Sequence, residues 1–388
     1  ETDYTPIVCF LALAVAIIPP IFVGEFGKWF HRALIFLVVS CPCALVISIP
    51  LSFFSGIGGA SKAGILVKGS NYLELLGKAK IAVFDKTGTL TKGVFKVVET
   101  CADGISEDDL LELAAYGEYY SNHPIAASIK AAYKGTVQID HLDGYEEISG
   151  MGIKVLKDGK EVLVGNKKLL DSRKISMAGA KQPSKVGTVL FVAENGAYKG
   201  CITIADEIKD GVKDAIASIK KCGIDNVVML TGDKKEVADS VAKELGIDTV
   251  CAELMPGDKV DKVEQLLREK DEDSTLIFTG DGINDAPVLM RADVGIAMGA
   301  MGSDAAIEAA DVVLMDDDPA KIALAMRIAR RTLRIVYQNI VFALAIKFAC
   351  LVLGALGLAH IGAAVFADVG VSVIAILNST RAMRTKVK

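Results

Sequence analysis

Two long apolar blocks, separated by a charged stretch of ordinary globular composition, constrain this chain more than any other feature. They cover residues 5–58 and 336–378 of the 388 residues, of which 52% are hydrophobic. A bilayer core of ~30 Å is crossed by a helix of about 20 residues. Buried core helices of a soluble protein are the alternative, but the run lengths favour a membrane bundle of four spans: Pro6–Val23, Ala33–Phe54, Val336–Leu358 and Ile361–Asn378.

The spans pair into two hairpins, with short outer turns predicted around Gly24–Arg32 and Gly357–His360. Basic residues follow the second and fourth spans, and such flanks mark the cytoplasmic side of a membrane. We therefore expect an integral protein of the plasma (inner) membrane, contacting lipid, with residues from about 60 to 330 in the cytoplasm. The basic flanks are Lys62, Lys68, Lys78 and Lys80, then Arg381, Arg384, Lys386 and Lys388.

Charge and cysteine content exclude two classes of protein. The net charge is -5 and no basic stripe stands out, so nucleic acid is not the expected partner. The 8 cysteines are scattered, unlike the framework of a secreted disulfide-rich domain. The chain does not begin with Met, and residues 1–4 are not a basic signal-peptide start. We interpret the N-terminus as a truncation of a longer protein.

Three apolar runs in the middle section end in turns rich in Asp, Gly and Thr. They are Ile81–Phe84, Val227–Leu230 and Thr275–Phe278, and a helical pattern over Lys234–Leu245 follows the second. Alternating buried strands and helices predict a doubly wound parallel sheet. Ligands bind such sheets at the carboxyl ends of the strands, so the three turns should converge on one site.

An insertion over residues 95–199 separates the first strand from the others. It opens with a helical pattern over Glu107–Tyr133 and continues with short alternating runs, including Ile153–Leu156, Glu161–Val164 and Val189–Ala193. We expect a separate α+β domain with an antiparallel sheet. The predicted organisation is a membrane hairpin over 1–58, an α/β domain over 59–94 and 200–332, the inserted domain over 95–199, and a second hairpin with a basic tail over 333–388.

The acidic turns carry the groups that phosphoryl transfer needs. Asp85 follows a strand directly, and a carboxylate there can attack a phosphoryl group to form an aspartyl-phosphate. Thr231 and the Gly232 backbone can donate to phosphate oxygens, and Lys259 can neutralise charge. Singly, each Asp is more often a helix cap or turn former. The carboxylates available to hold Mg²⁺ as hard oxygen ligands are Asp281 and Asp285.

These segments resemble the signature segments of P-type ATPases, which lie within the haloacid-dehalogenase superfamily. The matching segments are Asp85–Thr89, Thr231–Asp233 and Gly280–Pro287. The resemblance implies a haloacid-dehalogenase-like phosphorylation domain, ATP and Mg²⁺ as cofactors, phosphorylation at Asp85, and Mg²⁺ held at Asp281. It adds Thr87, Asp233 and Asn284 to the catalytic set, and places Asp85, Thr87 and Asp285 around Mg²⁺. Phosphatases of the superfamily usually carry a second Asp where this chain has Thr87, so the phosphoenzyme should persist.

The inserted domain offers a candidate nucleotide pocket. Glycines permit close approach of a flat ring to backbone, and His123 can stack on or hydrogen-bond adenine. An ordinary helix start with Pro in its first turn explains Ser121, Asn122 and Pro124 about equally well. The pattern also resembles the nucleotide domain of heavy-metal P-type ATPases. That resemblance makes the pocket residues Glu118, His123, Pro124, Gly150, Gly152, Gly165 and Asn166.

Cys41-Pro42-Cys43 lies inside the second span. Residues two apart on a straight helix point in nearly opposite directions, so two such thiols would not share an ion. Pro42 kinks or opens the helix, which lets both sulfurs turn to one side. Two small apolar cysteines beside a kink are the alternative. Lys347 and Asp368 lie in the third and fourth spans, and intramembrane charges usually mark ion pathways, although a purely structural Lys–Asp pair is possible.

A charge count favours a metal site. Two thiolates, one carboxylate, a divalent ion and Lys347 sum to zero, and thiolate with carboxylate suits Zn²⁺-like ions. The pattern resembles the zinc, cadmium and lead branch of the metal pumps. The copper branch would be expected to carry Asn, Tyr, Met and Ser in the last two spans. Asn339, Tyr337 and Ser372 are present, but the neighbouring Met-x-x-Ser-Ser is not, so copper(I) export is the alternative within the family.

P-type ATPases also need an actuator domain with a Thr-Gly-Glu loop, and no Thr-Gly-Glu occurs here. We expect the chain to lack this domain and the N-terminal spans, and to be unable to complete a cycle alone. Two other classes compete with a pump: a membrane-tethered phosphatase of the same superfamily and a non-enzymatic metal sensor. Thr87 and the intramembrane cysteines argue against the first, and the complete phosphoryl-transfer set argues against the second.

Overall fold

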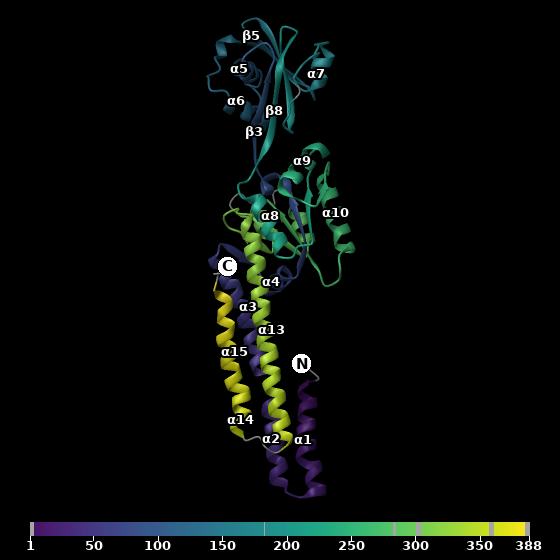
Figure 1. Cartoon of the computed structure of the whole chain (residues 1–388), viewed down its shortest axis with the longest axis vertical. Helices are drawn as coiled ribbons and strands as arrows, with labels where there is room; N and C mark the ends of the chain where they lie inside the picture. Colours follow the sequence, from purple (N-terminus) through teal and green to yellow (C-terminus); the bar gives the residue numbers. More distant parts are fainter. Residues whose placement is uncertain (1–3, 182, 282–284, 300–303, 357–360, 385–388) are drawn as a thin grey trace. The chain divides into compact units, whose positions relative to one another are not determined.

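Two compact units make up the structure, a computed structural model that describes residues 4–181, 183–281, 285–299, 304–356 and 361–384. The first unit comprises Glu1–Ala82, Ser218–Asp225 and Lys262–Lys388, and the second comprises Val83–Ala217 and Asn226–Asp261. Figure 1 colours the elements along the chain. The domain boundaries given above stay predictions.

Helices of the first unit form the membrane part. Among the described residues, four helical runs are long and apolar enough to cross a bilayer. Large apolar side chains such as Phe10, Phe22 and Phe348 are exposed on their outer faces, as expected for helices solvated by lipid. The chain is therefore an integral membrane protein. Its helices are α1 (Tyr4–Val23), α2 (Phe26–Ser40), α3 (Cys43–Lys62), α13 (Ala320–Ala355), α14 (Ile361–Val365), a π-helical turn η3 (Phe366–Gly370) and α15 (Val371–Ser379).

Two details of the spans differ from the prediction. The predicted outer turn Gly24–Arg32 is wrong: only Gly24 and Glu25 separate α1 from α2, because both residues adopt left-handed backbone conformations that reverse the chain at once. The third span is also not confined to the membrane, since α13 begins at Ala320 and continues unbroken for 36 residues. The predicted turn Gly357–His360 lies outside the described residues.

The first unit also contains the strands β1 (Ile65–Val67), β11 (Thr275–Gly280), β12 (Val294–Met298) and β13 (Val312–Leu314). Their order is β1-β13-β12-β11 followed by β2 (Ala79–Asp85). The pairs β11–β12 and β12–β13 are parallel, and the short edge strand β1 runs antiparallel to β13. The accompanying helices are α4 (Ser70–Gly77), α11 (Ala286–Arg291), α12 (Asp304–Ala309) and the 3₁₀ turn η4 (Thr380–Met383).

The second unit begins at Val83, so it includes the carboxyl end of β2. Beside it lie β9 (Asn226–Leu230) and β10 (Thr249–Cys251), which pair in parallel. The strands predicted at Ile81–Phe84, Val227–Leu230 and Thr275–Phe278 are thus confirmed as β2, β9 and β11. The helices here are α9 (Lys235–Leu245) and the starts of α8 (Val212–Lys221) and α10 (Pro256–Glu269).

The inserted part of the second unit is a six-stranded antiparallel sheet in the order β3-β8-β7-β6-β5-β4. Its helices cover an apolar core built on Leu110, Ile129, Val155 and Ile202. The helical pattern predicted over Glu107–Tyr133 is two helices, because the chain breaks at Glu118–His123. The elements are β3 (Thr91–Ala102), α5 (Glu107–Gly117), α6 (Pro124–Ala132), the 3₁₀ turn η2 (Ile139–His141), β4 (Leu142–Ile148), β5 (Gly152–Lys157), β6 (Lys160–Gly165), α7 (Lys167–Ser172), β7 (Thr188–Glu194) and β8 (Ala197–Ile208).

Candidate functional site

Asp85 is the last residue of β2 and is only 5% exposed. The chain then turns through η1 (Lys86–Leu90), where Gly88 adopts a φ of +77°, a conformation that glycine tolerates best. Lys259, near the start of α10, donates from Nζ to Asp85 Oδ1 at 2.6 Å. The structure therefore brings together the predicted nucleophile and the predicted phosphate-neutralising lysine.

Lys86, which directly follows Asp85, is a buried lysine with partners of its own. Lys86 Nζ lies 2.9 Å from Asp233 Oδ2 and 3.4 Å from Asp206 Oδ2, and the Thr91 hydroxyl also donates to Asp206. The sequence analysis assigned no role to Lys86 or Asp206. Asp206 lies within β8, two residues after the apolar run Cys201–Ile204, so an acid close behind an apolar run is the one local signal that could have drawn attention to it.

Replacing Lys86 with methionine should lower the free energy of unfolding by about 3 kcal/mol, because breaking a buried ion pair leaves an uncompensated charge behind. The Lys86 and Asp206 side chains are only 5% and 4% exposed. Pulse proteolysis in urea would measure the change. The control is Lys80→Met: Lys80 pairs with Asp225 at 3.1 Å but is 48% exposed, and its loss should cost less than about 1 kcal/mol. Equal effects of the two variants would contradict a structural role for the buried network.

The Thr231 turn follows β9 and is tightly held. Thr231 is 2% exposed, and its hydroxyl accepts a hydrogen bond from the Asp233 backbone N–H at 3.1 Å. Leu254 N–H donates to the Thr231 carbonyl at 3.1 Å. A Cβ at Gly232 would lie 3.2 Å from the Leu254 carbonyl oxygen, so a larger residue there would press on the loop. The turn is thus a compact backbone surface, as a phosphate-binding loop requires.

The two predicted Mg²⁺ carboxylates belong to the first unit. Asp285 is 1% exposed and stands at the N-cap position of α11 without a capping hydrogen bond from its side chain, and Asp281 directly follows β11. A Cβ at Gly280 would lie 3.0 Å from Asp285 Oδ2, so glycine leaves room for that carboxylate. Asn284 lies outside the described residues. The convergence of these carboxylates with Asp85 stays a prediction.

In the inserted domain, Glu118 ends α5 and His123 caps α6. The His123 Nδ1 accepts a hydrogen bond from the Ile125 backbone N–H at 3.2 Å, and Pro124 is the first residue of the helix. The helix-start interpretation therefore holds, and it leaves the rest of the His123 ring exposed. Glu118 is buried at 6% exposure. Burial, then the charge of Glu147 and then that of Glu118, raise the pKa of Tyr145, a residue that the sequence analysis passed over.

Two of the predicted glycines meet where β5 begins and β6 ends. Gly152 of β5 pairs directly with Gly165 of β6, and a Cβ on either would collide with backbone of the other strand. Asn166 follows and donates from Nδ2 to the Gly150 carbonyl at 2.8 Å. The two glycines therefore let β5 and β6 pack closely against each other, and the Asn166 hydrogen bond holds the preceding loop at Gly150.

Glu118→Gln should stabilise the protein at neutral pH. Burial raises the pKa of Glu118 above its ordinary value of 4.5, with a hydrogen bond from Ser121 acting the other way. The folded state therefore holds this proton more tightly than the unfolded state, so wild-type stability falls as pH rises from 4.5 to the raised pKa and stays lower above it. Urea unfolding of both proteins at several pH values should show the advantage of the variant vanishing below pH 4.5. An advantage independent of pH would refute this account.

The predicted intramembrane metal site lies at the helix break between α2 and α3. Cys41 adopts an extended backbone after α2, Pro42 takes φ −81° and ψ 29°, and α3 starts at Cys43. The predicted opening of the helix at Pro42 is therefore seen, and both sulfurs turn to the same side. They are joined in a disulfide, with the Cα atoms 5.5 Å apart, which the sequence analysis did not expect. The kink that lets two thiols share an ion also lets them bond to each other.

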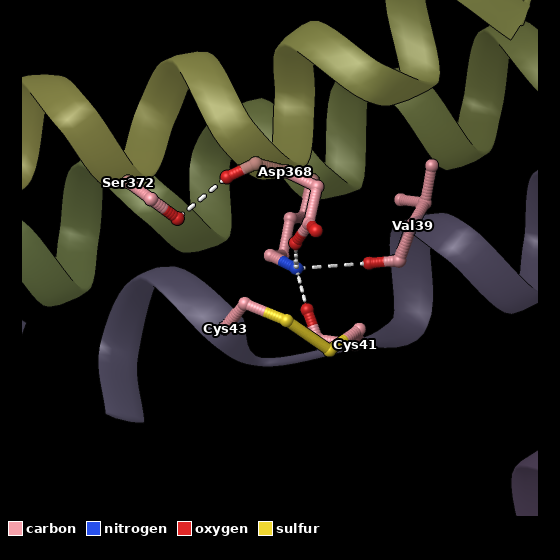
Figure 2. Close-up of a disulfide and its surroundings, with 6 residues drawn as sticks. Val39, Cys41, Cys43, Asp368 and Ser372 are labelled. Atoms are coloured by element: carbon pink, nitrogen blue, oxygen red, sulfur yellow. Dashed lines mark hydrogen bonds and ion pairs between the residues drawn. A yellow bond between two sulfur atoms is a disulfide. The ribbon is translucent and has the colours of Figure 1, made fainter. Parts of the chain in front are cut away.

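Asp368 approaches these sulfurs from η3, in another helical run, as Figure 2 shows. The Cys41 and Cys43 sulfurs and an Asp368 carboxylate oxygen all lie within 4.8 Å of one another. Ser372 donates to the Asp368 backbone carbonyl at 2.6 Å. Among the described residues this is the one cluster of three Cys, His or acidic side chains that could hold a metal.

Lys347 completes the cluster from α13. Its Nζ lies 3.6 Å from Asp368 Oδ1 and donates to the Val39 carbonyl at 3.1 Å and to the Cys41 carbonyl. Lys347 is only 7% exposed. Its ammonium group is therefore surrounded by protein, and its partners are the Asp368 carboxylate and the two carbonyls near the helix break. Lys347, Asp368 and the two cysteine sulfurs thus lie close together between membrane helices. This is the arrangement that the charge count predicted.

The chain is similar to known proteins in both sequence and structure. Residues 79–293 match the haloacid dehalogenase-like hydrolase family. A cadmium, zinc and cobalt-transporting ATPase of Bacillus subtilis is 54% identical over 99% of this chain and 55% of its own length. A solved catalytic domain of a CPx-ATPase, CopB-B, is 30% identical with a TM-score of 0.53, and the chain covers 96% of it.

The chain belongs to the P-type metal-transporting ATPases. The solved structure of a zinc-transporting PIB-type ATPase in its E2.Pi state extends the likeness to the membrane part of this P-type ATPase chain. It superimposes with a TM-score of 0.84 at 34% identity, over 98% of this chain and 63% of the other. The chain spans about half the length of the Bacillus subtilis relative. The haloacid-dehalogenase-like fold and the membrane helices predicted from the sequence are confirmed.

Proposed function

We propose that this P-type ATPase chain is the catalytic and ion-conducting part of a pump that moves zinc, or a similar soft divalent ion, through an aspartyl-phosphate at Asp85. The cluster of Cys41, Cys43 and Asp368 beside Lys347 carries the proposal, because soft sulfur and a carboxylate between membrane helices suit such an ion. The names of the relatives support it, since they include cadmium, zinc and cobalt transport.

In the proposed reaction, Asp85 attacks the γ-phosphorus of ATP and ADP leaves. Lys259 already touches the Asp85 carboxylate and can shift to the transferred phosphoryl oxygens as their charge develops. The Thr231 hydroxyl and the Gly232 backbone bind the same group. The hard oxygen donors Asp281 and Asp285, with Asp85 and Thr87, would hold Mg²⁺, which when bound offsets phosphate charge.

Glu118, His123 and the segment around Gly150, Gly152 and Gly165 would hold the adenosine of ATP. Burial raises the pKa of the Glu118 carboxyl, and a buried group with a shifted pKa is a candidate for a functional site. The catalytic domains would lie in the cytoplasm, where ATP is available, and the actuator domain and N-terminal spans would be supplied by the rest of the full-length protein.

Copper(I) export is less well supported. Asn339 donates its side-chain amide to the Ala375 carbonyl and to Ser379 Oγ, so it acts in helix packing. Tyr337 is 61% exposed, and the Ser372 hydroxyl is bonded to the Asp368 carbonyl. The hydrogen bonds of Asn339 and Ser372 thus go to backbone and hydroxyl groups of the neighbouring helices.

Phosphorylation of the full-length protein should depend on a soft divalent ion. With labelled ATP and Mg²⁺, we expect Zn²⁺ or Cd²⁺ to raise the acid-stable, hydroxylamine-sensitive label at least ~10-fold over a chelator control, and Cu⁺ and Mg²⁺ alone to leave it low. The reason is that the cluster combines sulfur with a carboxylate. Label raised by Cu⁺ and not by Zn²⁺, Cd²⁺ or Pb²⁺ would replace the proposal with its copper alternative.

A further inference from the structure

Five arginines line one hollow between the cytoplasm-proximal part of α13 and η4. The hollow has a volume of about 300 Å³, and Ile335 and Gln338 complete its lining. No carboxylate lines it among the described residues. The arginines are Arg327, Arg330, Arg331, Arg334 and Arg381.

Three of these arginines are positioned by neutral acceptors. Arg330 donates to the Gly77 carbonyl at 3.0 Å, to the Ala79 carbonyl at 3.4 Å and to the Cys222 carbonyl. Arg331 donates to the Arg384 carbonyl at 2.8 Å, and Arg381 donates to Asn378 Oδ1 at 2.7 Å. These acceptors fix the guanidinium groups in place without neutralising them, so the hollow keeps its positive charge.

The other two arginines hold the unused donors. Arg327 Nε is buried and has no hydrogen-bond partner among the described residues, although a buried donor usually finds one. Arg334 is exposed, seven residues further along α13, and helical spacing places both on one face with Arg330 and Arg331. A guanidinium offers its donors as a planar fork, which matches a carboxylate or a phosphate. The position of the hollow beside the membrane favours the phosphate.

The hollow lies next to the point where α13 enters the membrane. Ile335 and Gln338 belong to its lining, and the exposed Tyr337 lies between them in sequence, where aromatic side chains mark the membrane interface. Basic pockets between membrane helices on the cytoplasmic side bind anionic lipid headgroups. We propose that this hollow is a binding site for the phosphate group of an anionic phospholipid.

Lipid retention by the purified full-length protein tests the proposal. After equilibration with a mixture of phosphatidylglycerol and phosphatidylcholine in detergent, native mass spectrometry should show the wild type retaining phosphatidylglycerol preferentially. Each arginine near a lipid surface contributes about a five-fold preference, so Arg327→Gln/Arg334→Gln should reduce it by roughly 25-fold. The matched control Arg32→Gln removes an arginine of α2 that does not line the hollow, and should keep the preference.

The pair Arg327→Lys/Arg334→Lys keeps both charges and should retain most of the preference, which separates loss of charge from misfolding. Unchanged phosphatidylglycerol retention by the double glutamine variant would overturn the proposal. A second arm adds inorganic phosphate or glycerol phosphate without lipid. If these soluble ions bind at millimolar concentration with the same arginine dependence while no phosphatidylglycerol is retained, the ligand is a soluble phosphate and the lipid assignment is wrong. Neither arm measures ATP hydrolysis or metal transport.

Discussion

Asp85→Asn should abolish the acid-stable phosphoenzyme, reducing the label from ATP by at least ~100-fold. An amide nitrogen and oxygen are far weaker nucleophiles than a carboxylate, and no covalent intermediate can form through them. The shape of the side chain is nearly unchanged, and Lys259 can still reach the amide oxygen, so folding should survive. Labelled ATP with acid quenching, followed by hydroxylamine treatment, measures the acyl-phosphate directly.

The matched control is Asp225→Asn, which makes the same chemical change at an exposed surface ion pair with Lys80. It should be labelled like the wild type. Persistent hydroxylamine-sensitive label in Asp85→Asn would assign the nucleophile to another residue. Loss of label in both variants would point to an effect of charge on the whole protein and would remove the support for Asp85.

Zn²⁺ retention should fall by at least ~100-fold when any of Cys41, Cys43 or Asp368 is replaced by alanine. Loss of groups that merely orient a ligand costs about 10–100-fold in affinity, so loss of a ligand itself should cost no less. Equilibrium dialysis in detergent would measure it on reduced protein, because the disulfide between Cys41 and Cys43 must be opened by two electrons and two protons before the sulfurs can bind. The oxidised wild type should bind as poorly as the variants.

Cys350→Ala is the matched control for the cysteines. Cys350 also lies in a membrane helix, but its sulfur contacts the Ala363 carbonyl and it is not part of the cluster. It should retain Zn²⁺ fully. Lys347→Ala should change ion selectivity or release more than affinity, because an ammonium cannot be a ligand. Full Zn²⁺ affinity in Asp368→Ala would show that the site is drawn wrongly.

Local patterns in the sequence predicted much of this architecture. A strand followed at once by an acidic turn located Asp85 and Thr231, because both the apolar run and the turn residues are contiguous in sequence. Pro42 between two cysteines predicted a break in a membrane helix, since proline removes a backbone donor wherever it stands. Length and hydropathy alone identified the membrane helices.

The motifs also led us to expect that Lys259 meets Asp85 and that Asp368 meets the two cysteines, but other contacts and turns were not predicted. Lys86 pairs with Asp206 from 120 residues away, and no local pattern reports which acid meets which lysine. The carbonyls of Val39 and Cys41 became acceptors for Lys347 only because α13 packs beside the helix break. The early start of α2 depended on two left-handed residues, one of them Glu25, which sequence preferences do not reveal.

The unbroken helix α13 has a mechanical consequence (Figure 1). Arg330 ties it to backbone at Gly77, Ala79 and Cys222, and Ala79 begins the strand that ends in Asp85. Lys347 lies seventeen residues further along the same rod, or about 25 Å at 1.5 Å per residue. If α13 tilts as a rigid helix by about 5° about Arg330, Lys347 moves by about 2 Å over that distance. A displacement of that size would exchange the Asp368 and carbonyl contacts of the ammonium for others. A small rotation at the Arg330 end of α13 would therefore be enough to change which charges face the proposed ion.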